Sequence, residues 1–125
     1  MTSILMVDDE EDIDILIQQR FRYEIASGVY TFYFARDGRE ALTQIEGFPH
    51  IDIVVTDVNM PQMNGFELLD KIQSLYPHIR TIVVSAYSDD ESVNTSFHRG
   101  AAAFLIKPLD FKELQTTFAK LIQAT

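Results

Sequence analysis

The sequence has no cysteine, which excludes disulfide bonds and thiolate metal sites. It also has no apolar run of about 18 residues, the length that a membrane-spanning helix needs. The amino terminus, MTSILMVDD, has no basic stretch of the kind that opens a secretory signal. We therefore expect a cytoplasmic protein that does not enter the membrane.

Basic residues are also few: ten Lys and Arg stand against 19 Asp and Glu, for a formal net charge of −9. Binding to nucleic acid phosphates depends on clustered Lys and Arg, so we expect no direct nucleic acid binding by this chain. The negative charge suits a metal cation or a basic surface on a protein partner.

Short apolar runs do occur, and they alternate with amphipathic stretches. The runs are rich in β-branched and aromatic residues, and they cover residues 4–7, 31–35, 51–56, 81–85 and 103–106. Several are apolar on both faces, which is typical of parallel strands covered on both sides by helices. The length of 125 residues fits one domain, spanning residues 1–125.

The stretches between these runs carry helix signals. Three of them have apolar residues at helical spacing: Ile13, Leu16, Ile17 and Phe21; Phe66, Leu69, Ile72 and Tyr76; and Leu114, Phe118, Leu121 and Ile122. Three pairs match the capping box at a helix start: Asp37 with Glu40, Ser88 with Glu91, and Asp110 with Glu113. Gly47 is the predicted C′ residue that ends the second helix. Leu109 and Leu114 are spaced as a hydrophobic staple at the start of the last helix. Five strands alternating with five helices predict an α/β fold, a flavodoxin-like (βα)5 doubly wound parallel sheet with strand order 2-1-3-4-5.

In such a sheet, ligands bind outside the carboxyl ends of the strands. Asp8 and Asp9 follow the first predicted strand, and Asp57 follows the third. Ser85 ends the fourth predicted strand, and Lys107 follows the fifth. We therefore expect these five polar side chains to converge at one edge of the sheet.

The three carboxylates among them point to a divalent cation. Like charges about 4 Å apart repel by about 4 kcal/mol at an effective dielectric constant near 20, and a bound cation removes this penalty. Oxygen ligands without His or Cys favour Mg²⁺. A lysine and a hydroxyl beside the cation suit the oxygens of a phosphoryl group, and one aspartate could then be its nucleophile. The acidic loop argues against nucleotide or flavin binding, which favours Gly, Ser or Thr at this position.

The motifs at these strand ends resemble those of the receiver domain of bacterial two-component response regulators. They are VDDE after the first strand, TDVNMPQMNG at residues 56–65, VVSA in the fourth strand, and GAAAFLIKP at residues 100–108. Each is weak alone, but the four occur in order and each stands at a strand end. The resemblance covers nearly the whole chain, from residue 3 to about residue 123.

The resemblance implies that Asp57 accepts a phosphoryl group from a phosphohistidine of a sensor histidine kinase or a histidine phosphotransfer protein. It implies that Asp8 and Asp9 organise Mg²⁺, with Asp57 and the backbone carbonyl of Asn59 as further ligands. Lys107 would contact one phosphoryl oxygen. On this reading the chain is no enzyme for other substrates and catalyses only its own phosphorylation and dephosphorylation.

The resemblance also implies a switch. Ser85 would hydrogen-bond a phosphoryl oxygen and move toward it, and Phe104, at the position of the family's switch aromatic, would turn inward. The Lys107–Pro108 peptide bond would be cis. We expect the face formed by residues 88–99, 103–106 and 110–123 to change and to control an effector domain or a downstream protein. Residues 88–99 contain only two large apolar side chains, Val93 and Phe97, so this helix is predicted to be the least anchored.

Other interpretations remain open. Glu10, Glu11 and Asp12 are read mainly as acids that favour the start of the first helix. Taken singly, Asp57 fits a turn residue, Ser85 a helix-entry residue, Lys107 a surface charge and Phe104 a core residue. The whole chain could be a phosphorylation-independent receiver-like interaction module or a Mg²⁺-dependent phosphatase with an aspartate nucleophile. A homodimer through the last two predicted helices is also left open.

Overall fold

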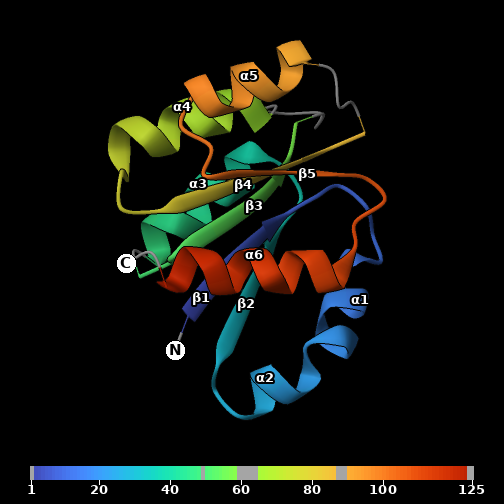
Figure 1. Cartoon of the computed structure of the whole chain (residues 1–125). Coiled ribbons are helices and arrows are strands. Elements are labelled where there is room, and N and C mark those ends of the chain that lie inside the picture. The colour runs from blue at the N-terminus through green and yellow to red at the C-terminus, as the bar shows by residue number, and fades with distance from the viewer. Residues whose placement is uncertain (1, 49, 59–64, 87–89, 124–125) are drawn as a thin grey trace.

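The computed structural model describes residues 2–48, 50–58, 65–86 and 90–123. Its centre is one sheet of five parallel strands in the order β2-β1-β3-β4-β5 (Figure 1). The strands are β1 (Thr2–Val7), β2 (Tyr30–Ala35), β3 (Ile53–Asp57), β4 (Arg80–Ser85) and β5 (Ala103–Ile106). The predicted fold class and strand order are confirmed.

The described part of the chain contains six helices, one more than the sequence predicts. They are α1 (Ile13–Arg20), α2 (Arg22–Ala26), α3 (Gly38–Gly47), α4 (Gly65–Leu75), α5 (Asp90–His98) and α6 (Phe111–Gln123). The extra helix arises because the first predicted helix is interrupted at Phe21, where φ is −108° and ψ is 22°. The ring of Phe21 is fully buried, so its packing continues the apolar stripe although the helix itself is interrupted.

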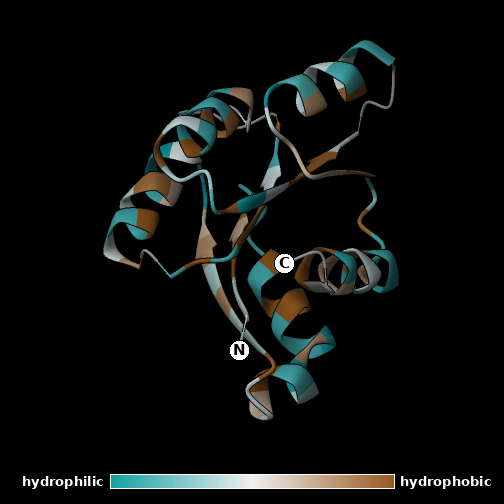
Figure 2. Cartoon of the chain, turned by 60° about the vertical axis from the view of Figure 1, so that its left-hand side comes forward, coloured by the Kyte–Doolittle hydropathy of each residue, from teal (hydrophilic) through white to brown (hydrophobic). Residues whose placement is uncertain are grey.

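Alternation along the central strands sends side chains to two separate cores. In β1, Ile4 and Met6 face one core, which is closed by α1 and α6, whereas Leu5 and Val7 face the other, which is closed by α3 and α4. β3 alternates in the same way, whereas in β4 Ile82 and Val84 face the first core and Val83 faces a smaller third cluster. Figure 2 shows this arrangement coloured by hydropathy: the helices around the central strands have both apolar and polar residues. Both faces of the sheet are covered, as parallel sheets require.

The predicted helix caps are largely confirmed. The carboxylate of Asp37 accepts a hydrogen bond from the backbone N–H of Glu40 at 2.9 Å. The carboxylate of Asp110 accepts hydrogen bonds from the backbone N–H groups of Lys112 and Glu113. Gly47 is the last residue of α3 and Phe48 is the C-cap, so the prediction of Gly47 as the C′ residue is wrong. The predicted cap at Ser88 lies outside the described residues.

Two residues of the predicted apolar stripes are not buried: Leu16 is 46% exposed and Ile122 is 37% exposed. In α5, Ser96 is the buried residue and Phe97 is 47% exposed, which supports the prediction of a weakly anchored helix. Leu114 and Phe118 in α6 are fully buried.

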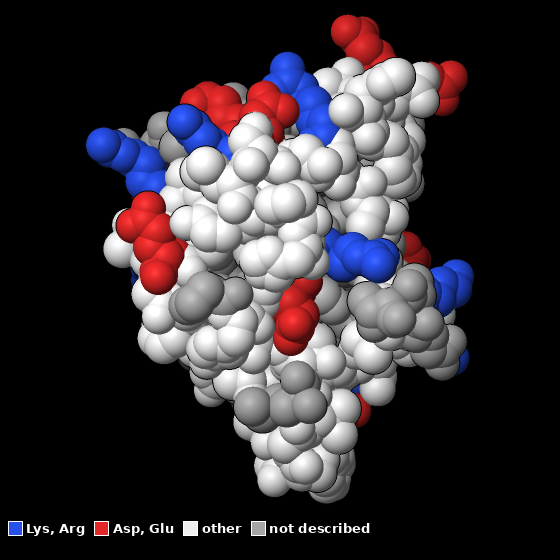
Figure 3. Space-filling view, turned by 90° about the vertical axis from the view of Figure 1, so that its left-hand side faces the viewer, with Lys and Arg blue, Asp and Glu red and all other residues white. Residues whose placement is uncertain are grey.

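Charges are interspersed on the face of the molecule seen in Figure 3, where basic and acidic side chains lie next to one another along the upper edge and are scattered elsewhere. No continuous basic patch is visible on that face. Among the helices that the structure describes, none combines the length and the apolar character needed to cross a bilayer.

Candidate functional site

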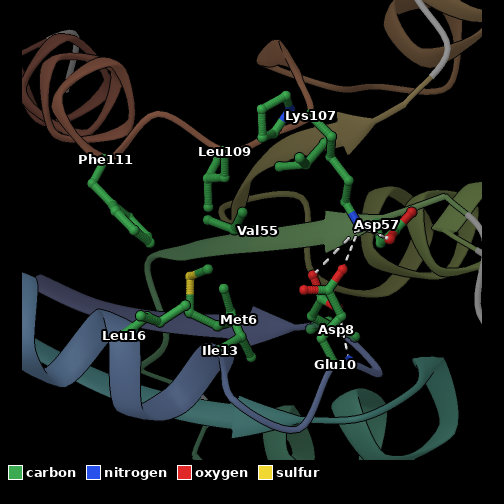
Figure 4. Close-up of a pocket in the computed structure, with 13 residues that line it drawn as sticks. Met6, Asp8, Glu10, Ile13, Leu16, Val55, Asp57, Lys107, Leu109 and Phe111 are labelled. Atoms are coloured by element: carbon green, nitrogen blue, oxygen red, sulfur yellow. Dashed lines mark hydrogen bonds and ion pairs between the residues drawn. The ribbon is translucent and has the colours of Figure 1, made fainter.

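Three aspartates meet at the carboxyl edge of the sheet. β1 pairs with β3 through Val7 and Thr56. Asp8, the residue after β1, and Asp57, the last residue of β3, therefore emerge side by side. Asp9 joins them, and carboxylate oxygens of the three residues all lie within 4.8 Å of one another. Asp57 is buried, whereas Asp9 is exposed. Figure 4 shows the side chains of Asp8 and Asp57 converging at this edge.

The backbone around Asp57 is held by a close approach of the start of α4. The N–H of Gly65 donates a hydrogen bond to the carbonyl of Val58 at 3.1 Å. A Cβ atom on Gly65 would lie inside van der Waals contact of the Asp57 carbonyl oxygen and of the Val58 backbone, so only glycine fits there without movement. The Thr56 hydroxyl donates a hydrogen bond to the same Asp57 carbonyl at 3.0 Å.

Lys107 brings a positive charge to the three carboxylates. Its backbone N–H donates to the Ser85 carbonyl at 2.8 Å, which fixes the start of the segment after β5. Its ammonium donates a hydrogen bond to the carboxylate of Asp57. The same Nζ atom lies 3.8 Å from an oxygen of Asp8 and 3.6 Å from an oxygen of Glu10. The Lys107–Pro108 bond is cis, as expected from the resemblance.

The electrostatics of this cluster favour an added cation. Burial raises the pKa of Asp8, the negative charges of Glu10 and Asp57 raise it further, and these effects outweigh the Glu10 N–H and Lys107, which lower it. Burial alone would lower the pKa of Lys107, but the hydrogen bond to Asp57 and the nearby carboxylates outweigh burial and raise it. Lys107 is therefore a cation at neutral pH, and one lysine does not fully compensate the acids around it.

A hard divalent cation fits this set of ligands. The donors of Asp8, Asp9 and Asp57 are all carboxylate oxygens, which are the ligands that Mg²⁺ prefers. Their separation of less than 4.8 Å allows one ion to contact more than one of them. Asn59, which the resemblance gives as a further ligand through its carbonyl, lies outside the described residues.

The two remaining predicted residues lie on β4 and β5. Ser85 is buried at the end of β4 and is paired with Ile106 in the neighbouring strand. Phe104 is paired with Val83 and is partly buried against a small core that includes Leu69 of α4. The structure therefore places Ser85 beside the strand ends that carry Asp57 and Lys107. It places Phe104 on the edge strand β5, where it packs against the cluster that includes Leu69.

A cavity of about 250 Å³ adjoins the carboxylates, between α1 and the segment that leads into α6. Asp8, Asp57 and Lys107 form its polar end, and most of its remaining walls are apolar (Figure 4). Leu16 lines this cavity, and its partial exposure is thereby explained.

Glu10 is the residue that the sequence interpretation assigned wrongly. It was expected to favour the start of a helix, but α1 begins three residues later, at Ile13, and the side chain of Glu10 points to Lys107. Asp12 is at the N-cap position of α1, yet its side chain makes no capping hydrogen bond. A run of acids before a helix carries no signal that would separate Glu10 from Glu11, so this contact is visible only in the structure.

Comparisons with known proteins agree with this geometry. A family model described as the response regulator receiver domain matches residues 4–119. The transcriptional regulatory protein ZraR of Escherichia coli (strain K12) is 36% identical over 123 residues, which are 98% of this chain and 27% of ZraR. The chain thus spans about a quarter of the length of that relative.

Solved structures show the same fold over almost the whole chain. A response regulator receiver domain protein (CheY-like) from Methanospirillum hungatei JF-1 matches with a TM-score of 0.84 and 30% identity, covering 98% of this chain and 95% of its own. The response regulator TrrA from Thermotoga maritima, in complex with Mg(2+)-BeF, matches with a TM-score of 0.80 and 30% identity, covering 97% and 99%.

Proposed function

Since the chain belongs to the response regulator receiver domain family, we propose that residues 1–125 form one receiver domain with Asp57 as its phosphoacceptor. The observation that carries this proposal is the convergence of Asp8, Asp9, Asp57 and Lys107 at one edge of the sheet. Asp57 is the buried member of the three acids and the one that is hydrogen-bonded to Lys107. It is therefore the carboxylate with the most restricted position, as a nucleophile requires.

In the proposed reaction, a carboxylate oxygen of Asp57 attacks the phosphorus of a phosphohistidine on a sensor histidine kinase or a histidine phosphotransfer protein. The new O–P bond forms as the P–N bond to the donor imidazole breaks. The imidazole leaves with the bonding electron pair and takes up a proton from water. Lys107 and Ser85 contribute donors for the phosphoryl oxygens, and the lysine offsets the negative charge that the transfer brings into the site.

Mg²⁺ is part of the proposal, with Asp8, Asp9 and Asp57 as its ligands and the carbonyl of Asn59 as a further one. A bound Mg²⁺ would supply positive charge that neutralises these carboxylates and polarises the phosphoryl oxygens. The relative TrrA was solved in complex with Mg(2+)-BeF, which supports this assignment for the family.

The proposal is tested by intact mass spectrometry of the purified chain after incubation with acetyl phosphate, with and without Mg²⁺. We expect one phosphoryl adduct in the presence of Mg²⁺ and none when the metal is removed with EDTA. The expected metal dependence follows from the crowding of three carboxylates around the acceptor.

An adduct that forms equally well in EDTA would contradict the role of Mg²⁺. If the folded chain forms no adduct under either condition, the phosphorylation-independent interaction module becomes the better proposal. Turnover of a small phosphate ester would instead favour a Mg²⁺-dependent phosphatase. The cytoplasmic location stays a prediction.

We further propose that phosphorylation changes the face formed by α5, β5 and α6 and thereby controls an effector domain or a downstream protein. Ser85 would move toward the phosphoryl group and Phe104 would follow it inward. α5 is suited to such a change, because Ser96 is its buried residue and Phe97 is half exposed. A homodimer through α5 and α6 stays one form that this output could take.

Amide hydrogen exchange of the Mg²⁺-loaded chain, with and without beryllium fluoride as a phosphoryl mimic, tests the switch. We expect protection across residues 90–100 to change by about fivefold or more, the range of ordinary allosteric coupling free energies. The helix α3 lies over the opposite face of the sheet from α6 and serves as an internal control. Unchanged protection across residues 90–100, with beryllium fluoride bound, would refute the switch.

A further inference from the structure

The ammonium of Lys107 has three carboxylate neighbours, and they differ in their exposure to solvent. The side chains of Asp57 and Asp8 are 8% and 13% exposed, whereas that of Glu10 is 65% exposed. Glu10 is therefore the most solvent-exposed of the three acids, and Figure 4 shows it next to Asp8 at the Lys107 ammonium. Neither the predicted metal ligands nor the predicted phosphoryl contacts include Glu10.

The backbone and the side chain of Glu10 have separate contacts. Its backbone N–H donates a hydrogen bond to the Asp8 carboxylate at 2.9 Å, and any residue except proline keeps that donor. Its side-chain carboxylate lies 3.6 Å from Nζ of Lys107. A substitution at Glu10 can therefore remove the side-chain charge and leave the support of Asp8 in place.

An incoming phosphoryl group would meet this carboxylate on its way to Asp57. The group is negatively charged, and it must come from solvent, to which Asp57 is only 7% exposed. It needs hydrogen-bond donors from Lys107, and Glu10, the most exposed of the three acids, already lies 3.6 Å from the same ammonium. The carboxylate of Glu10 thus competes with the phosphoryl oxygens for the Lys107 ammonium, and it also repels the negatively charged phosphoryl donor.

We propose that Glu10 is an anionic gate, a positioning residue that holds the Lys107 ammonium and slows the entry of negatively charged phosphoryl donors. The inference rests on the proposed function, because it assumes that Asp57 is phosphorylated. The gate acts through charge, so its effect depends on the charge of the donor and weakens with ionic strength.

The experiment compares Glu10→Gln with Glu11→Gln in the full chain loaded with Mg²⁺. Both substitutions remove one negative charge from neighbouring exposed positions, but Glu11 does not line the cavity that contains Asp57 and Lys107. At low salt, we expect Glu10→Gln to accelerate phosphorylation by acetyl phosphate about threefold to fivefold, the range that a partly exposed charge contact supports. Glu11→Gln should change the rate less than about twofold, as expected for an exposed charge at longer range.

A second donor separates a gate from a structural effect. Phosphoramidate carries less negative charge than acetyl phosphate at neutral pH, so Glu10→Gln should accelerate it less, and the difference between the donors should shrink in high salt. Equal acceleration of both donors, equal effects of the two substitutions, or a slower reaction in Glu10→Gln would each overturn the gate.

The contact itself has a readout that does not need phosphorylation. In chain with ¹⁵N-labelled lysine, the Lys107 ammonium resonance should shift in Glu10→Gln and stay unchanged in Glu11→Gln. An unchanged resonance in Glu10→Gln would overturn the gate even if the native chain forms its adduct. Absence of any adduct on the native chain, with the resonance shift present, would instead refute the proposed function and leave the contact established.

Discussion

A chain that carries Asp57→Asn is expected to gain no phosphoryl group from acetyl phosphate under conditions in which the native chain is fully phosphorylated. Asparagine has nearly the same volume as aspartate, so the packing around this buried position should be kept. Its neutral amide lacks the anionic oxygen that attacks phosphorus, and the nucleophilic step is lost. Intact mass spectrometry with Mg²⁺ present measures the result.

Asp52→Asn is the matched control, because Asp52 stands just before the other end of the same strand, β3. The side chain of Asp52 accepts a hydrogen bond from the Ser3 N–H at 2.9 Å, which an amide oxygen can also accept. This variant should be phosphorylated like the native chain. A phosphoryl adduct on Asp57→Asn would assign the acceptor role to another residue, and peptide mapping would then show whether it is Asp8 or Asp9.

The strand order and the convergence of the polar residues could be predicted from the hydrophobic pattern of short segments and from the general topology of doubly wound sheets. Strands such as residues 4–7 are apolar on both faces, which already indicates a covered parallel sheet. In a doubly wound sheet the carboxyl ends of neighbouring strands share one edge, so Asp8 and Asp57 had to lie close together. Roles such as that of Ser85 required the resemblance to a family as well.

The details that could not be predicted depend on contacts between distant parts of the chain. The interruption of the first helix occurs at Phe21, a residue that fits the apolar stripe, and its ring packs against Tyr30, Phe32 and Phe118 from other elements. Helical periodicity indicates which face of a helix is apolar. It does not indicate whether the backbone remains helical at each residue along that face. The contact of Glu10 with Lys107 joins residues almost a hundred positions apart, and local sequence carries no information on it.

Replacement of Phe118 by alanine is expected to lower the free energy of unfolding by about 3–5 kcal/mol, the usual range for a buried phenylalanine. Phe118 is fully buried in α6, and its ring contacts those of Phe21, Tyr30 and Phe32 at centroid distances of 5.5–6.3 Å. The contacts tie α6 to β2 and to the junction of α1 with α2. Urea unfolding followed by circular dichroism measures the change.

Phe97→Ala is the matched control, since it removes the same side chain from α5, the other helix of the surface that we propose to switch. Phe97 is 47% exposed, and we expect this substitution to cost about 1 kcal/mol or less. A large difference between the two variants would mean that α6 is a fixed support and that α5 can shift at a small cost in free energy. Phosphorylation at Asp57 would then act mainly on α5. Similar costs for both variants would show that α5 is anchored as firmly as α6 and would remove the energetic reason to place the switch there.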